Sequence, residues 1–167
     1  MKPLIFTLVG PDKPGLLSSL SKAVYERGGN WLGSNFSHMA GYFAGFVQVD
    51  LPLDKHQELV ELFSRHPDLT IHLVPGQDGP KAEGQTAQIN IMGNDKAGIV
   101  QELTKVLNRF DVNITKFDSS CTSAPNWGSP LFKANAVIEL GPEVDADELA
   151  AALEDIADDL MVDIDLM

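Results

Sequence analysis

An internal repeat constrains the fold of this chain more than any other feature of its sequence. The segment GPDKPGLL at 10–17 returns as GNDKAGIV at 93–100, 83 residues later. Hydrophobic residues alternate before each segment, as in a strand, and recur at helical spacing after it. Each copy therefore predicts a strand that enters a glycine turn and continues into an amphipathic helix. Two copies of one supersecondary unit are expected to fill the chain.

The elements that follow the first helix also correspond between the two copies. Each copy continues with two paired strands, a second helix and a closing strand. The expected ranges are 31–38, 42–50, 54–66 and 69–74 in the first copy, and 114–121, 131–140, 146–159 and 161–166 in the second. This order is typical of the α+β class. It predicts two tandem ferredoxin-like βαββαβ units, each a four-stranded antiparallel sheet with two helices on one face.

The connection between the paired strands differs in length between the copies. Ala40 and Gly41 predict a tight connection in the first copy. The connection at 122–130 in the second copy is six residues longer and carries Trp127. In one interpretation this tryptophan anchors a protein partner, and in the other it folds back onto its own loop.

The domain boundaries follow from the same pattern. Residues 1–75 are expected to form the first domain and residues 86–167 the second, with 76–85 as a linker that has no apolar period. No run of about 18 apolar residues is available to span a bilayer, and the first strand is too short for a secretory signal. The single cysteine, Cys121, agrees with a reducing compartment. We expect a soluble protein of the cytoplasm.

The sheet face that points away from the helices is expected to differ between the two domains. Alternation places mostly hydrophobic side chains on this face in the first domain and polar or charged ones in the second. The residues concerned are Ile5, Thr7, Val9, Phe46 and Val74 against Gln88, Asn90, Lys133, Asn135, Asp163 and Asp165. Because large bare apolar patches are uncommon on soluble monomers, the first face is expected to be covered by the other domain or by a second chain, in a homodimer.

The charge of the chain excludes one class of partner. Acidic residues number 24 against 12 basic ones, a formal net charge of −12, and the eleven charged side chains after Lys133 are all acidic. A surface that binds nucleic acid needs clustered lysine and arginine to contact the phosphates. Direct binding to nucleic acid or to an anionic membrane is therefore not expected, and the acidic run predicts a solvated helix face.

The repeated glycine turns are the candidate ligand sites. Each turn places backbone N–H groups at a helix N-terminus, which favours a bound carboxylate, and the neighbouring Asp12 or Asp95 can receive an ammonium group. Together with Asn30 or Asn113, this predicts a cradle for a free amino acid, which carries one charge of each sign. The alternative is structural: the glycines make turns, the aspartates cap helices and the asparagines adopt a left-handed backbone.

These residues resemble the signature of ACT domains, small regulatory modules that in many members bind amino acids. The resemblance extends over essentially the whole chain, through DKPGLL at 12–17 with Asn30 and DKAGIV at 95–100 with Asn113. In that family the ligand lies between this turn and the sheet edge of a neighbouring unit, often across a dimer interface. The resemblance implies a ligand site formed by Asp12, Gly15, Leu16, Asn30, Asp95, Gly98, Ile99 and Asn113.

Two departures from the motif imply that the two sites need not bind a ligand equally well. Ala97 replaces the proline of the motif in the second copy. The residue after the motif asparagine is Ile114 in the second copy and the much larger Trp31 in the first.

A two-unit chain of this length also resembles the glycine cleavage system transcriptional repressor group, whose members are regulators. We therefore expect a non-enzymatic protein without a cofactor that senses an amino acid and acts through a protein partner, with a DNA-binding regulator as one candidate. The alternatives are a ligand-free interaction module and a small acylphosphatase-type hydrolase on the same fold. The hydrolase needs an arginine to hold phosphate, and Arg27, Arg65 and Arg109 lie at the ends of helical segments, away from the turns.

The remaining candidates carry less chemistry. His38 and Cys121 occupy equivalent positions in the two copies. One interpretation of this match is a shared metal or thiol site. One ligand type per unit falls short of the three or four ligands that zinc needs, so a plain strand residue in each unit is the alternative. The chain also lacks the glycine patterns typical of serine hydrolases, P-loop proteins and dinucleotide-binding enzymes.

Overall fold

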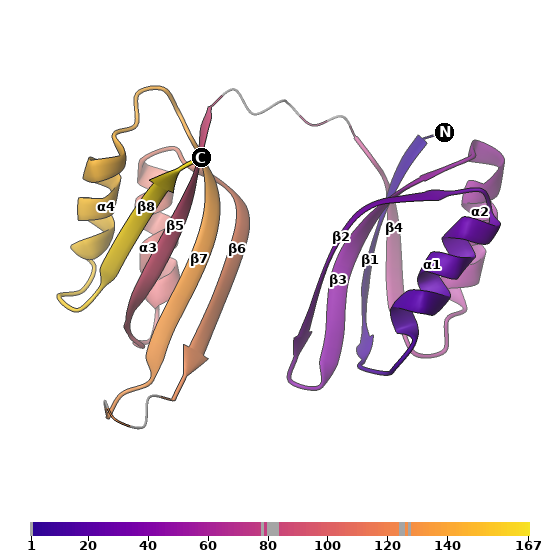
Figure 1. Ribbon diagram of the computed structural model, residues 1–167, viewed down its shortest axis with the longest axis horizontal. Coiled ribbons are helices and arrows are strands. Elements are labelled where there is room, and N and C mark those ends of the chain that lie inside the picture. Colours follow the sequence, from indigo (N-terminus) through magenta and orange to yellow (C-terminus); the bar gives the residue numbers. More distant parts are fainter. Residues whose placement is uncertain (1, 78, 80–83, 124–125, 127) are drawn as a thin grey trace. The chain divides into compact units, whose positions relative to one another are not determined.

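The computed structural model describes residues 2–77, 79, 84–123, 126 and 128–167 and contains two compact units, Met1–Gly79 and Pro80–Met167 (Figure 1). Residues 78 and 80–83 of the expected linker, and Trp127 of the long loop, lie outside the described residues. The first unit contains β1 (Lys2–Pro11), α1 (Leu16–Glu26), β2 (Asn30–Met39), β3 (Tyr42–Leu51), α2 (Leu53–Ser64) and β4 (Thr70–Pro75). The second contains β5 (Gln85–Asn94), α3 (Ile99–Arg109), β6 (Asn113–Thr122), β7 (Leu131–Leu140), α4 (Ala146–Glu154) and β8 (Met161–Leu166).

Both sheets have the strand order that the ferredoxin-like fold requires. The first is ordered β2-β3-β1-β4 and the second β6-β7-β5-β8, and every neighbouring pair is antiparallel. In each unit both helices lie on the same face of the sheet (Figure 1). The predicted fold class and the predicted order of elements are therefore confirmed.

The duplication extends to irregularities of the strands. The register of β2 against β3 shifts between Trp31 and Gly33, and that of β6 against β7 shifts at the matching residues, Ile114 and Lys116. One extra residue at such a bulge bends the edge strand in the same way in both units. The predicted tight connection between β2 and β3 is confirmed, since Ala40 and Gly41 have φ values of 50° and 84°, as the two central residues of a hairpin turn require.

Two helices end earlier than the hydrophobic pattern predicted. Helix α4 stops at Glu154 rather than 159, because the backbone N–H groups of Ile156 and Ala157 donate to carbonyls three residues back, in tighter turns. These turns still pack Ile156 and Ala157 against the core. The spacing of apolar residues in the sequence therefore continues as in a helix although the helix has ended. Helix α2 stops at Ser64, and the ring of His66 then accepts hydrogen bonds from the backbone N–H groups that follow.

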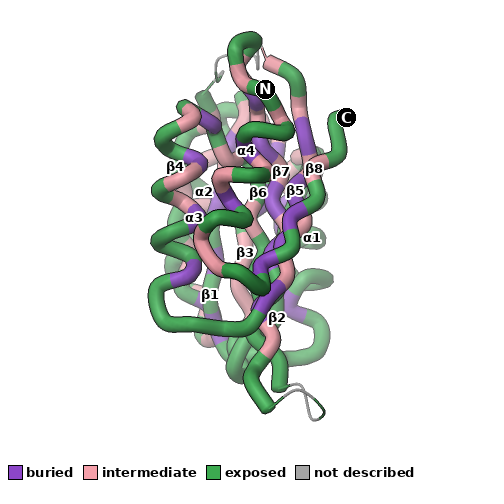
Figure 2. Tube along the Cα trace, turned by 90° about the vertical axis from the view of Figure 1, so that its left-hand side faces the viewer, coloured by how far each residue is buried: buried purple, intermediate pink, exposed green. Residues whose placement is uncertain are grey.

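Each unit has its own hydrophobic core between its sheet and its helices. Buried positions, purple in Figure 2, alternate with exposed ones along the strands, so that Leu4, Phe6 and Leu8 of β1 face α1 and α2. On the opposite face, Phe46 and Val74 of the first unit are 54% and 50% exposed. The alternation predicted from the sequence is confirmed, and it leaves an apolar surface on the first unit, which we call the apolar sheet face; it comprises Ile5, Val9, Phe46 and Val74.

Candidate functional site

The predicted turns connect β1 to α1 and β5 to α3, and they have the same backbone geometry. Each helix begins after a glycine in the left-handed region, Gly15 with φ 84° and Gly98 with φ 84°. Glycine is needed there because a Cβ atom makes this conformation costly. No side chain caps either helix. The interpretation in which Asp12 and Asp95 cap the helices is therefore wrong.

The asparagines also differ from the structural interpretation. Outside glycine, the described residues with a positive φ are Ala40 and Asp111. Asn30 and Asn113 are the first residues of β2 and β6, and their backbones are not left-handed. A left-handed backbone therefore does not explain why asparagine occurs at these two positions.

A surface hollow lies at each turn. The first, of about 350 Å³, is lined by Asp12, Lys13, Gly15, Leu16, Leu17, Ser18 and Phe43. The second, of about 380 Å³, is lined by Asp95, Lys96, Ala97, Gly98, Ile99, Val100, Ser119, Ser120, Cys121 and Phe132. We call them the first and second turn hollows. Three of the four sequence-predicted residues of each unit come together in its hollow.

The phenylalanine in each turn hollow was missed by sequence reasoning. Phe43 and Phe132 lie at corresponding positions near the starts of β3 and β7 and pair with Gly10 and Gly93 across the sheet. The offset between these strands is 89 residues rather than 83, because the long loop lies between the two strands of the second unit. A comparison at that shifted offset would have shown the match.

Asn30 and Asn113 do not join the turn hollow of their own unit. Each follows the C-terminus of an 11-residue helix whose N-terminus forms the hollow, a separation of about 16 Å at 1.5 Å per residue. Asn30 lines a different hollow of about 440 Å³, with Tyr25 and Trp31. Asn113 donates a hydrogen bond through Nδ2 to Glu139 Oε2 at 2.8 Å.

The backbone of each turn is partly occupied by the protein itself. The N–H of Asp12 donates to the carbonyl of Gly41 at 3.2 Å, and that of Asp95 to the carbonyl of Pro130 at 2.8 Å. Among the described residues, the N–H groups of Leu16 and Leu17 in the first unit and of Val100 in the second find no acceptor, whereas the N–H of Ile99 donates to the carbonyl of Lys96 at 3.2 Å. The helix start therefore still offers donors to an anionic group in the hollow.

The side chains around the two aspartates differ. Asp12 Oδ2 lies 3.8 Å from His38 Nε2, an ion pair when the imidazole is protonated. At the matching position of the second unit, Cys121 and Asp95 line the same hollow. Hydrogen bonding to Asp95, desolvation and the charge of Asp95 raise the pKa of Cys121 above its ordinary value, so the thiol stays protonated at neutral pH. His38 and Cys121 thus share a neighbour, the turn aspartate, and no group of three potential metal ligands occurs among the described residues.

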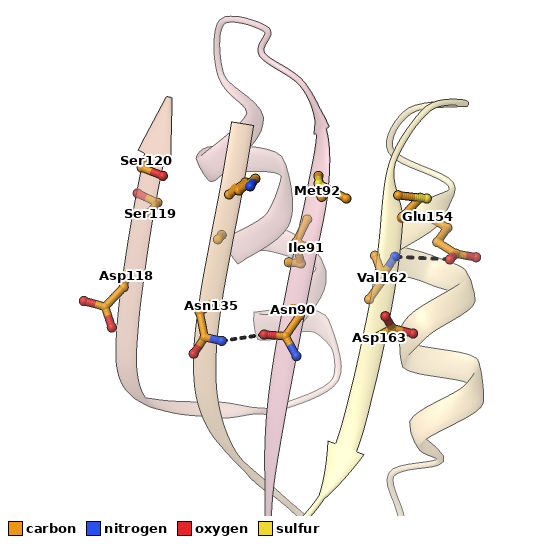
Figure 3. A pocket seen from close by; sticks show the side chains of 13 residues that line it. Asn90, Ile91, Met92, Asp118, Ser119, Ser120, Asn135, Glu154, Val162 and Asp163 are labelled. Atoms are coloured by element: carbon orange, nitrogen blue, oxygen red, sulfur yellow. Dashed lines mark hydrogen bonds between the residues drawn. The ribbon is translucent and has the colours of Figure 1, made fainter. Parts of the chain in front are cut away.

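A larger hollow, of about 730 Å³, lies on the polar sheet face of the second unit (Figure 3). Asp118, Asn135, Asn90 and Asp163 form a row across its four strands. Asn135 donates to Asn90 (Figure 3), and Gln88 also donates to Asn90 at 3.5 Å. Because these amides bond one another and the face is open to solvent, the row needs no ligand to satisfy it. We therefore take the turn hollows as the candidate site.

The fold and these hollows define a class of protein: two tandem ferredoxin-like units, each with a glycine-initiated helix beside an aspartate. The family model of the ACT domain matches residues 2–73 and 85–121, which include both turns and both motif asparagines. The chain belongs to the ACT domain family. This family is typically regulatory rather than catalytic, and its domains typically bind amino acids.

Two solved structures resemble the whole chain. An unknown protein from Galdieria sulphuraria is 22% identical, with a TM-score of 0.84 over 99% of this chain and 98% of that one. A protein described as a glycine cleavage system transcriptional repressor is 16% identical, with a TM-score of 0.65 over 99% of this chain and 97% of that one. At these identities the likeness shows the fold. A comparison with curated proteins finds no match.

None of the helices in the described part of the chain is long and apolar enough to cross a membrane.

Proposed function

We propose that this protein is a non-enzymatic regulator that senses a free amino acid in its turn hollows and passes the signal to a protein partner. The observation that carries the proposal is the duplicated hollow: in both units one aspartate and the start of one helix line the same small space. The N–H groups of a helix start favour a carboxylate, and the aspartate favours an ammonium group. An α-amino acid carries both.

The motif asparagines support a site that is completed by a neighbouring unit. Asn30 and Asn113 lie a helix length away from the turn of their own unit, so they would reach a ligand held at such a turn only from a neighbouring unit. We propose that the protein is a homodimer and that a bound ligand shifts its population between two arrangements. Residues 76–85 would join two domains, 1–75 and 86–167.

The acidic composition supports a protein as the target of the signal. A net charge of −12 opposes contact with the phosphates of DNA. If the regulator acts on transcription, for example of glycine cleavage, it acts in the cytoplasm through a DNA-binding partner. The family's regulatory character supports this proposal over a hydrolase.

Replacing Phe46 by aspartate tests the homodimer. Phe46 is 54% exposed on the apolar sheet face, so a charge there disfavours an interface without disturbing the core of the unit. We expect the apparent mass in size-exclusion chromatography to fall by about half, because each buried charge without a partner costs several kcal/mol. An unchanged elution profile and an unchanged melting temperature would contradict the role of this face.

The sensing proposal is tested with the double variant Asp12→Ala/Asp95→Ala. Thermal shift and calorimetry with each of the free amino acids should find at least one that stabilises the wild type, by about 2.7 kcal/mol when its concentration is 100 times its Kd. The double variant should lose this stabilisation, because neither hollow retains a carboxylate for the ammonium group. The matched control Asp54→Ala/Glu143→Ala removes two exposed carboxylates elsewhere and should keep it.

Two other results, one from this experiment and one from a separate assay with an acyl phosphate, would favour the alternatives. If no amino acid stabilises the wild type, the turns are structural and the protein is a ligand-free interaction module. If the protein hydrolyses an acyl phosphate, it is an enzyme.

A further inference from the structure

The strands that border the two turn hollows give them different walls. In the first unit Phe36 of β2 stacks on Phe43, with ring centroids 5.0 Å apart and planes at 14°. The repeat places Ser119 where the first unit has Phe36. The wall of the second turn hollow is formed by Ser119, Ser120, Cys121 and Phe132. The two volumes are similar. The difference lies in chemistry: Ser119 lines the second hollow at the position where the first unit has Phe36, whose ring stacks on Phe43 of the first hollow.

The two aspartates also have different neighbours. Asp12 lies next to His38, whereas Asp95 lies next to a neutral thiol. The neighbouring Lys96 does not neutralise Asp95, because its ammonium group is held by Glu102 at 2.9 Å and by the carbonyl of Ile156 at 3.1 Å. Asp95 has no cationic partner among the described residues, and its charge is available to an ammonium group.

The free backbone donors of the two turns lie at different positions. In the first turn the N–H of Leu16 has no acceptor, whereas in the second that of Ile99 donates to the carbonyl of Lys96 at 3.2 Å. Pro14 has no N–H group, while Ala97, at the matching position, has one and lines the second turn hollow. The exchange leaves the turn unchanged, since Gly15 and Gly98 share φ 84° with ψ values of 1° and 3°. The N–H of Ala97 has no acceptor in the described part of the chain, so it can donate to a ligand carboxylate.

We infer that the two turn hollows have divided roles: the second binds the ligand, and its serine wall selects a small amino acid whose side chain forms hydrogen bonds, while the first does not bind it. This inference rests on the proposed function. Ser119 is the specificity-determining residue, because its hydroxyl lies where the first unit has an aromatic ring. Asp95 receives the ammonium group of the ligand, and the N–H groups of the turn receive the carboxylate.

The test is calorimetry on the full chain with three pairs of amino acids of similar shape: serine with alanine, threonine with valine, and asparagine with leucine, plus glycine. The wild type should bind one equivalent per chain, and a polar member should bind about tenfold more tightly than its apolar partner, since an unpaired hydroxyl in the site costs about that factor. Asp95→Asn should weaken binding at least tenfold, and the matched Asp12→Asn less than twofold.

Variants of Ser119 separate selectivity from binding. Ser119→Phe places beside Phe132 the ring that Phe36 provides beside Phe43 in the first unit, and it should abolish binding, with circular dichroism to check the fold. Ser119→Ala keeps the space and should reduce the preference for the polar member of each pair at least fivefold while leaving the apolar member unchanged.

The outcomes distinguish this inference from the proposed function. Two equivalents per chain, or an equal loss in Asp12→Asn and Asp95→Asn, would overturn the division of roles and leave the sensing function standing. Tightest binding by glycine or by an apolar member would overturn the selectivity. If no free amino acid binds the wild type, the proposed function and the inference fail together.

Discussion

Replacing Phe6 by alanine is expected to lower the free energy of unfolding of the first unit by about 3–5 kcal/mol. The Phe6 side chain is fully buried. Its ring packs edge-on against Phe63, with centroids 4.9 Å apart, and against Trp31 at 6.0 Å. Alanine removes this buried surface and leaves a cavity that the surrounding strands cannot close. The loss is a large share of the 5–15 kcal/mol that stabilises a typical domain.

Urea denaturation followed by circular dichroism measures this effect. Tyr25→Ala is the matched control, because Tyr25 is also aromatic and in the first unit but 80% exposed; its effect is expected to stay within about 0.5 kcal/mol. The second unit has a separate core, so the part of the signal that reports its unfolding should not shift. A loss below about 1 kcal/mol in Phe6→Ala would show that this aromatic cluster does not hold the first unit together.

Gly45→Ala is expected to destabilise the first unit by about 3 kcal/mol, the upper end of the range for overpacking. Gly45 lies on β3 opposite Phe36. A Cβ atom there would overlap the carbonyl oxygen of Asn35 and would come within 2.9 Å of Phe36 Cα. These are backbone atoms of the neighbouring strand, so the β2–β3 pair must move apart instead of a side chain turning away.

Gly33→Ala provides the control for Gly45→Ala within the same sheet. Nothing lies within 4 Å of a Cβ atom built on Gly33, and its φ is not positive. Alanine at this position should be neutral or should stabilise the unit by up to about 1 kcal/mol, because it reduces the freedom of the unfolded chain. Equal unfolding midpoints for the two variants would contradict this prediction, because they would mean that β2 can move away from a Cβ atom at position 45 at little cost in stability.

Most of the fold was predictable from the sequence because the signals are local. Alternation separated the buried Leu4, Phe6 and Leu8 from the exposed face of β1, and spacing of three and four placed Leu103 and Leu107 on the buried side of α3. The ends of α2 and α4 were less predictable. Short turns after a helix keep an apolar side chain on the same side, so hydrophobic spacing does not show where the helix stops.

The candidate site was predictable in part. The repeat located both turns, and the pairing of His38 with Cys121 in the sequence marked a position that the structure places beside each turn aspartate. The pattern could not show that Asn30 lies a helix length from Gly15. That separation depends on where the helix begins and ends, since a residue 15 positions along the chain is distant across a helix and close across a turn.

The sequence by itself determined that the chain folds as two copies of one unit, which faces of its strands and helices are buried, and that each first helix begins at a glycine turn. These features depend on periodicity and on the backbone freedom of single residues, which act over a few positions. Only the tertiary structure decided which side chains share a hollow. It stacked Phe36 on Phe43, brought His38 to Asp12 and left Asp95 without a cation in the described part of the chain. Such contacts depend on strand register and on the path of the turn across the sheet edge, and residues far apart in the sequence set both.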